Sequence, residues 1–201
     1  MELFTNIKAR LVVKGFRQKE GLDYFDTYSL MTRITSIRML IALAAVYGLK
    51  IHQMDVKTAF LNGELEKIEQ PDCFVVPGKE KKVCKLSKSL YGLKQAPKQW
   101  HAKCDQTMLS KGFKINECDK CVYIKDTPNQ EVLCQYVDDM LIMSNDIANI
   151  KATKRMLASK FDMKDLGVAD VILGIKILKT PNGLALSQTH YIQKILEKFN
   201  F

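Results

Sequence analysis

The sequence lacks the features that mark membrane and secreted proteins. Its longest apolar run, Met39–Val46, is far shorter than the roughly 18 to 20 residues that a membrane-spanning helix needs. The first residues contain no apolar stretch of signal-peptide length. The six cysteines are scattered through apolar segments, which is typical of small buried side chains and not of a disulfide framework. We therefore expect an intracellular protein that is not secreted and keeps free thiols.

Several common site motifs are also missing. The sequence has no Walker A, Gly-x-Gly-x-x-Gly or Gly-x-Ser-x-Gly segment. Cys118 and Cys121 have the spacing of a zinc-binding pair, but no second Cys or His pair follows at ligand spacing, which disfavours a structural zinc. Acidic residues are outnumbered, because 31 Lys and Arg oppose 22 Asp and Glu and give a net charge of +9. This balance favours a polyanionic partner, either nucleic acid or an acidic membrane surface.

The apolar pattern predicts the fold class. With 201 residues, 47% of them hydrophobic, the chain is long enough for one domain or a compact pair of subdomains. Helical spacing predicts helices from Thr35 to near Gly48, over Ala96–Gly112, over Ser144–Phe161 and from Thr189 onward. Shorter apolar runs predict strands at Ala9–Lys14, Ile51–Val56, Phe74–Val76, Val83–Leu86, Cys121–Lys125, Val132–Val137, Val171–Leu178 and Leu184–Ser187. Because hairpins interleave with helices, we predict an α+β fold with a mainly antiparallel sheet.

Three aspartates stand at the ends of predicted strands. Asp138 and Asp139 separate the apolar run ending at Val137 from the run Met140–Met143, and Asp55 lies near the end of Ile51–Val56. Adjacent strand residues point to opposite faces, but a hairpin turn allows adjacent carboxylates to share a site. If the Asp55 strand pairs beside that hairpin, the resulting cluster is best explained by bound Mg²⁺ or Mn²⁺. The alternatives are a solvated turn for the pair and a helix N-cap for Asp55.

Four longer motifs carry a resemblance to a known family. In order and spacing, the chain from about Ile7 onward resembles the reverse transcriptase of copia-type LTR retrotransposons through Lys8–Val12, Gln53–Gly63, Ser89–Pro97 and Tyr136–Asp139. The resemblance implies a right-hand polymerase, an RNA-directed DNA polymerase that transfers deoxynucleotides to a primer 3′-hydroxyl with two Mg²⁺ or Mn²⁺ ions. It implies Asp55 and Asp138 as the principal metal ligands, Asp139 as the third carboxylate, and Val56 at the metal site.

The resemblance also implies roles for residues around the incoming nucleotide. Phe60 matches the bulky residue that sterically excludes the 2′-hydroxyl of a nucleotide, although without the resemblance a core aromatic side chain is the simpler interpretation. Lys164 matches a lysine that protonates pyrophosphate, although a surface lysine is the simpler interpretation. The other implied nucleotide-binding residues are Arg10 and Lys8 in the fingers, the stretch Val56, Lys57, Thr58 and Ala59, and the loop residues Gly92 and Lys94.

The same resemblance implies a division of the chain. Residues 7–50 and 67–96 correspond to fingers, 51–66 and 97–178 to the palm, and 179–201 to the end of the primer-grip hairpin and the start of the thumb, with 1–6 unmatched. The implied partners are an RNA or DNA template with a DNA primer, deoxynucleoside triphosphates, and a larger polyprotein with integrase and ribonuclease H. The implied location is a cytoplasmic particle or the nucleus, with no membrane partner.

Departures from the family pattern leave other interpretations open. The stretch from Glu66 to Gln70 is shorter than the family's, Leu30-Met31 replaces a usual Pro-Val, and Cys73 replaces a usual glycine. Together with the apparent truncation at both ends, these departures fit a catalytically inactive retroelement relic that at most binds nucleic acid. A metal-dependent nuclease would use the same carboxylates, but Phe60 and the basic fingers strand argue against it.

Overall fold

A computed structural model describes residues 12–21, 23–27, 29, 31–63, 67–70, 75–128, 130–181 and 183–199. Lys8, Arg10 and the first half of the predicted strand Ala9–Lys14 lie outside these residues. Its described half, residues 12–14, forms only an isolated bridge between Val12 and Tyr91 and no strand. The chain divides into two compact units, a first unit of Met1–Ser29 and Thr58–Asp105 and a second unit of Leu30–Lys57 and Gln106–Phe201. None of the helices in the described part of the chain combines the length and the apolar character of a membrane span.

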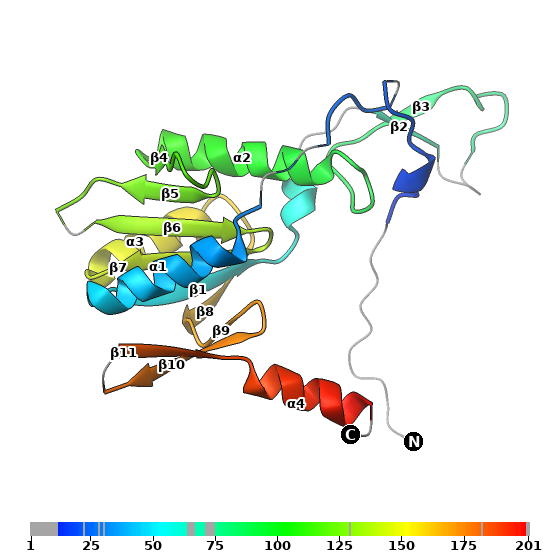
Figure 1. Ribbon diagram of the computed structural model, residues 1–201. Coiled ribbons are helices and arrows are strands. Elements are labelled where there is room, and N and C mark those ends of the chain that lie inside the picture. Colours follow the sequence, from blue (N-terminus) through cyan, green and yellow to red (C-terminus); the bar gives the residue numbers. More distant parts are fainter. Residues whose placement is uncertain are drawn as a thin grey trace, which may run out of the picture. The chain divides into compact units, whose positions relative to one another are not determined.

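The second unit is built on a six-stranded sheet. Its strands are β1 (Lys50–Val56), β4 (Lys114–Ile115), β5 (Val122–Lys125), β6 (Glu131–Tyr136), β7 (Asp139–Ser144) and β8 (Met163–Val168). They lie in the order β4-β5-β6-β7-β1-β8, and each neighbouring pair is antiparallel (Figure 1). A three-stranded sheet of β9 (Val171–Ile172), β10 (Ile175–Thr180) and β11 (Gly183–Ser187) follows, in the order β11-β10-β9. The predicted α+β class and antiparallel sheet are confirmed.

Strand alternation gives the six-stranded sheet two different apolar faces. Ile51, Leu141 and Met143 pack with Ile37 and Ile41 of α1 (Ile34–Val46) in one buried cluster. Their strand neighbours point the other way, toward α3 (Ile147–Ala158), whose Ile150 and Leu157 are buried. Figure 1 shows α1 and α3 on opposite sides of the sheet. The last helix, α4 (Thr189–Lys198), has no buried residue.

Two predicted helix starts differ from the structure. α1 begins at Ile34, because Thr32 Oγ1 and the Arg33 backbone N–H both donate hydrogen bonds to Asp119 Oδ2 and so hold the chain just before the helix. α3 begins at Ile147, where the side chain of Asp146 caps it by accepting a hydrogen bond from the Ala148 N–H. Ser144, the predicted start, is the last residue of β7 and is fully buried.

The first unit contains η1 (Gly15–Arg17), η2 (Ala59–Asn62), β2 (Lys67–Glu69), β3 (Val83–Lys85) and the beginning of α2 (Ala96–Ser110). The helix predicted over Ala96–Gly112 is confirmed as α2, and Trp100, Cys104 and Met108 are buried along one side of it. The predicted hairpin of Phe74–Val76 with Val83–Leu86 is wrong, because β3 pairs with β2 and Val75 and Val76 lie outside any strand. Phe74 itself lies outside the described residues.

The side chain of Gln70 explains that change of partner. Its Nε2 donates hydrogen bonds to the carbonyl oxygens of Lys79 and Lys82, and its Oε1 accepts one from the Val76 N–H. Because these backbone groups are satisfied by one side chain, the segment closes as a loop and needs no strand ladder.

Leu141 provides a test of the core. It is 1% exposed on β7, opposite Cys134 on β6 and Gln53 on β1. Leu141→Ala should lower the free energy of unfolding by about 2 to 5 kcal/mol, because the cavity cannot collapse between paired strands. The matched control Leu166→Ala, at a side chain 41% exposed on β8, should change it by no more than about 0.5 kcal/mol. Urea denaturation measures both, and similar losses in the two variants would contradict the assigned core.

Candidate catalytic carboxylate site

The pairing register of β1 brings three of the predicted site residues into one row. Asp55 is the partner of Asp139 on β7 and, on its other side, of Lys164 on β8. Directly paired residues of antiparallel strands point to the same face of the sheet. Asp55 therefore lies between a carboxylate and an ammonium group, on the face that also carries Ile51 and Leu141.

The turn between β6 and β7 holds the third carboxylate. It consists of Val137 and Asp138, and Val137 has a φ of +53°. This left-handed conformation is strained for a β-branched residue, and such strain collects at functional sites. The Val56 N–H donates a 2.8 Å hydrogen bond to the carbonyl oxygen of Asp138, so the turn is tied to the end of the strand that carries Asp55. The aspartate pair and Asp55 thus share one end of the sheet, as the sequence predicts.

Asp139 is held by a residue that the sequence analysis missed. Its Oδ1 accepts a 2.7 Å hydrogen bond from Nε2 of Gln53, which is itself only 6% exposed. Burial raises the pKa of Asp139, the hydrogen bond from Gln53 lowers it, and the negative charge of Asp55 raises it again. The available signal was alternation, because Gln53 precedes Asp55 by two residues and so shares its face. A polar side chain at such a core position needs a partner.

The donor set fits a hard divalent cation. Within the described ranges, no group of three or more His, Cys, Asp or Glu side chains is already gathered closely enough to hold a metal ion. The chemistry of the set is nevertheless suitable, since all three side chains offer only carboxylate oxygens. The charge of Asp55 already disfavours ionisation of Asp139, and a cation between them would relieve that repulsion.

Two predicted nucleotide-binding residues of the second unit follow Asp55. Val56 is 1% exposed, so only its backbone is available to a ligand. Lys57 forms a 2.9 Å ion pair with Oδ1 of Asp162, and its backbone N–H donates to the Asp162 carbonyl oxygen. Both side chains of this pair are more than half exposed, so the contact is weak and the Lys57 ammonium remains accessible.

In the first unit, Thr58, Ala59 and Phe60 lie at the start of η2. Ala59 is fully buried, and the Asn62 side chain donates to the carbonyl oxygens of Thr58 and Ala59, which fixes this turn. The Phe60 ring lies 5.2 Å from that of Tyr91, centroid to centroid, at an interplanar angle of 55°. The tilted contact orients the Phe60 ring.

Gly92 and Lys94 organise the next part of the first unit. Gly92 has a φ of +92°, and a Cβ there would lie 2.1 Å from the Val13 carbonyl oxygen, so only glycine fits. The Lys94 ammonium donates to the Gln18 carbonyl oxygen and to the Tyr24 hydroxyl, and lies 4.7 Å from the centroid of the Tyr24 ring. The Lys94 ammonium is thus engaged with residues of its own unit. Arg10 and Lys8 lie outside the described residues.

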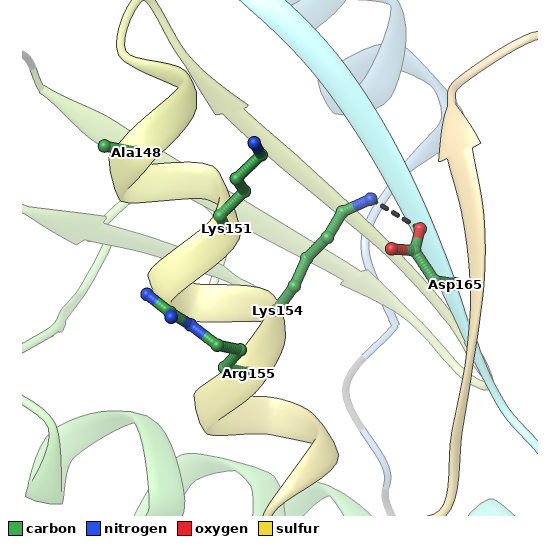
Figure 2. A pocket seen from close by; sticks show the side chains of 5 residues that line it. All are labelled: Ala148, Lys151, Lys154, Arg155 and Asp165. Carbon is green, nitrogen blue, oxygen red and sulfur yellow. Dashed lines mark hydrogen bonds and ion pairs between the residues drawn. The ribbon is translucent and has the colours of Figure 1, made fainter.

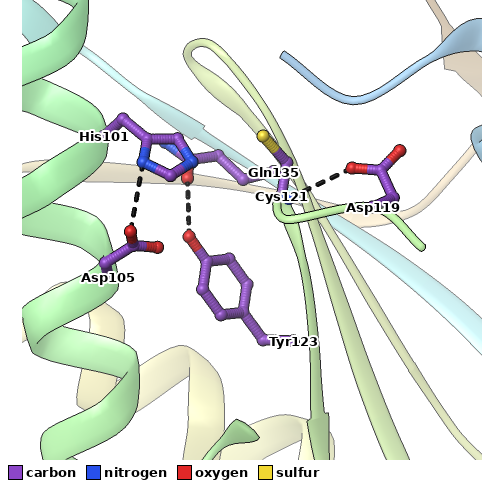
Figure 3. Close-up of polar contacts among 6 residues, drawn as sticks. All are labelled: His101, Asp105, Asp119, Cys121, Tyr123 and Gln135. Carbon is purple, nitrogen blue, oxygen red and sulfur yellow. Dashed lines mark hydrogen bonds and ion pairs between the residues drawn. The ribbon is translucent and has the colours of Figure 1, made fainter. Parts of the chain in front are cut away.

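Other polar contacts are explained by structure alone. Figure 3 shows the 3.2 Å contact between Nδ1 of His101 and Asp105, the hydrogen bond from the Tyr123 hydroxyl to Gln135, and that from the Cys121 N–H to Asp119. Tyr123 and Gln135 are both buried on neighbouring strands, so their bond satisfies two polar groups of the core. Cys121 is buried and Cys118 exposed, and both are free thiols.

Comparison with known proteins gives a consistent result. A family model described as reverse transcriptase (RNA-dependent DNA polymerase) matches residues 3–201. The retrovirus-related Pol polyprotein from transposon TNT 1-94 of Nicotiana tabacum is 51% identical over 200 residues, which cover 96% of this chain and 15% of the relative. The Pol polyprotein from transposon RE1 of Arabidopsis thaliana is 39% identical over 197 residues, covering 96% and 13%. The chain therefore spans less than a sixth of the length of these two relatives.

The match to a yeast relative covers a larger share of that relative's own length. The putative transposon Ty5-1 protein of Saccharomyces cerevisiae is 35% identical over 146 residues, which cover 70% of this chain and 47% of the relative.

The Gln53 hydrogen bond predicts a pH-dependent effect on stability. Gln53→Leu removes the contact that lowers the pKa of Asp139, so this pKa rises further. An acid whose pKa is higher in the folded state destabilises the fold as pH rises from its unfolded pKa, about 3.9, through its folded pKa. The free energy of unfolding of the variant should therefore be lower by about 1.5 kcal/mol at pH 7 and by less at pH 3.5. This value is the low end of the range for a hydrogen bond to a charged group, because Asp139 is partly exposed.

Urea denaturation at the two pH values measures this effect. In an Asp139→Asn background the difference between the two pH values should disappear, because residue 139 no longer ionises. An equal loss at pH 7 and pH 3.5 in the Asp139 protein would show that Gln53 acts only through packing.

Proposed function

The chain belongs to the reverse transcriptase (RNA-dependent DNA polymerase) family, and we propose that it extends a DNA primer along an RNA or DNA template. In this proposal it is the polymerase part of a copia-type retrotransposon Pol polyprotein that also carries integrase and ribonuclease H and acts inside the cell. The observation that carries the catalytic part is the register that sets Asp55 opposite Asp139, next to the turn with Asp138.

We propose that Asp55, Asp138 and Asp139, with the backbone carbonyl of Val56, hold two Mg²⁺ or Mn²⁺ ions. Bound there, such ions supply Lewis acidity toward the attacking hydroxyl and neutralise the charge that develops on the leaving oxygen. Support comes from the all-oxygen donor set and from the electrostatic repulsion between the carboxylates of Asp55 and Asp139. The Gln53 amide keeps one oxygen of Asp139 oriented, which leaves its second oxygen for a ligand.

The reaction is an in-line displacement at phosphorus. The primer 3′-hydroxyl releases its proton to solvent water as its oxygen forms a bond to the α-phosphorus, the bond from that phosphorus to its bridging oxygen breaks, and pyrophosphate leaves with the electron pair. Lys164, the partner of Asp55 on β8 and an exposed side chain, is proposed to donate a proton from Nζ to that leaving oxygen.

Nucleotide-binding roles are proposed for residues within each unit. Arg10 and Lys8 hold its phosphates, the backbone of residues 56–59 faces the triphosphate, and Gly92 and Lys94 line the loop near the base. Support for the loop comes from Lys94, whose contacts with Gln18 and Tyr24 fix that part of the first unit. We assign residues 7–50 and 67–96 to fingers, 51–66 and 97–178 to the palm, and 179–201 to the primer grip and the start of the thumb.

Primer extension tests the catalytic proposal directly. Asp138→Asn should lower the extension rate on an RNA template by roughly a hundredfold or more, because it removes a charged ligand of the proposed metal ions. The control Asp126→Asn changes an exposed aspartate that pairs with Lys114 and should leave the rate within about twofold. Chelation of divalent cations should abolish extension in both proteins. Equal rates for the two variants, or no extension by the unaltered chain, would favour the catalytically inactive relic.

Phe60 is proposed to exclude ribonucleotides by contact with the 2′-hydroxyl. Phe60→Ala should raise ribonucleotide incorporation relative to deoxynucleotide incorporation by about tenfold or more, since a steric barrier is removed. Tyr91→Leu, which loses the ring that contacts Phe60, should give a smaller change in the same direction. Competition between the two nucleotides in one extension reaction measures the ratio, and an unchanged ratio in Phe60→Ala would mean that Phe60 is only a packing residue.

A further inference from the structure

The second unit also carries a basic pocket, separate from the site of Asp55, Asp138 and Asp139. A pocket of about 370 Å³ is lined by Ala148, Lys151, Lys154 and Arg155 of α3 and by Asp165 of β8. Lys151, Lys154 and Arg155 are three and four residues apart, a spacing that sets them on one side of the helix. Figure 2 shows Lys154 reaching from the helix toward Asp165, while the head groups of Lys151 and Arg155 point elsewhere.

The pocket carries an excess of positive charge. Lys154 forms an ion pair with Asp165, and its side chain is only 11% exposed, so this cation is neutralised and belongs to the pocket floor. Neither Lys151 nor Arg155 forms an ion pair or side-chain hydrogen bond with any residue that the structure describes. The lining therefore carries three cations and one carboxylate, and two of the cations are available to an external anion.

Strand alternation sets this pocket on the other face of the sheet from the catalytic carboxylates. On β8, Lys164 pairs with Asp55, whereas the next residue, Asp165, pairs with Met54. Successive strand residues point to opposite faces, and the ion pair of Asp165 with Lys154 agrees with this direction. Because β8 is the last strand in the order of the six-stranded sheet, Lys164 and Asp165 mark the two faces at one sheet edge.

We propose that this pocket binds phosphate groups in the backbone of a single-stranded nucleic acid that passes around the β8 edge. The nucleic-acid ligand rests on the proposed function, whereas the phosphate chemistry rests on the two available cations. The Arg155 guanidinium can bind a phosphate through two parallel hydrogen bonds and Lys151 as a point charge. Duplex DNA is stiff, with a persistence length of about 150 base pairs. A flexible single strand can therefore follow the β8 edge from one face of the sheet to the other more easily than a duplex can.

The composition of the pocket also predicts its selectivity. Among the residues that the structure describes, its lining contains no aromatic side chain on which a base could stack. Contacts to phosphate without contacts to bases carry no sequence information. The site should therefore bind DNA and RNA strands of any sequence, with an affinity that falls steeply as salt concentration rises.

Fluorescence anisotropy with a labelled oligothymidylate tests the pocket on the full chain. Lys151→Ala/Arg155→Ala should weaken binding by about tenfold at 0.1 M salt and reduce the log–log salt slope by about 1.4, since each lost single-strand phosphate contact accounts for about 0.7. Lys111→Ala/Lys120→Ala removes the same charge from two exposed lysines and should change the affinity by less than twofold. Equal weakening in both double variants, or an unchanged salt slope in the first, would overturn the proposal.

Two further measurements separate the possible sources of the phosphate and the two proposals. Calorimetric titration with inorganic phosphate should show only weak binding. Tight phosphate binding that is lost in Lys151→Ala/Arg155→Ala, while the oligothymidylate affinity of that variant is unchanged, would overturn the proposal of a nucleic-acid strand and indicate a free anion as the ligand. Primer extension at saturating primer-template should survive in the pocket variant. If the unaltered chain fails to extend a primer while the two double variants still differ in oligothymidylate binding, the catalytic proposal fails and the pocket is supported.

Discussion

The antiparallel register of β1 against β7 is the constraint on which the site depends. It sets Ile51 opposite Met143 and Gln53 opposite Leu141 before it sets Asp55 opposite Asp139. A slip of one residue would turn Asp55 to the face of α3 and turn Ile51 away from α1. Burial of Ile51, Leu141 and Met143 with α1 therefore fixes the position of a carboxylate several residues away.

This arrangement forces like charges together, and the surrounding residues reduce the cost. The pKa of Asp139 is raised by burial and by Asp55, and the Gln53 amide acts in the opposite direction. Lys164 flanks Asp55 on the other side, and Val137 accepts a strained conformation in the turn. The repulsion between these charges supports the proposed cation site. The edge strand β8 turns the residue after Lys164, Asp165, toward the basic pocket on the opposite face.

The sequence predicts the parts of this structure that have a clear period or a distinctive turn. The α1 and α2 helices and the hairpin around Asp138 follow from apolar spacing. The predicted strand Val171–Leu178 is wrong as one strand, because a turn at Leu173 and Gly174, both at positive φ, divides it into β9 and β10. β8 has no such pattern, because Lys164, Asp165, Leu166 and Val168 are exposed and its register shifts at Gln53/Met54. Partner choices across the chain, such as β2 with β3, the Gln53 bond to Asp139 and the Lys94 contacts with Tyr24, depend on tertiary neighbours that local patterns do not contain.

The central claim is that Asp55, Asp138 and Asp139 act as one divalent-cation site. Carboxyl carbon NMR of the chain with labelled aspartate, titrated with Mg²⁺, measures this most directly, because each aspartate reports separately. We expect these three resonances to shift together over one range of Mg²⁺ concentration, while those of Asp126 and Asp165 stay unchanged. Independent shifts of the three, or a response confined to exposed aspartates elsewhere, would contradict it.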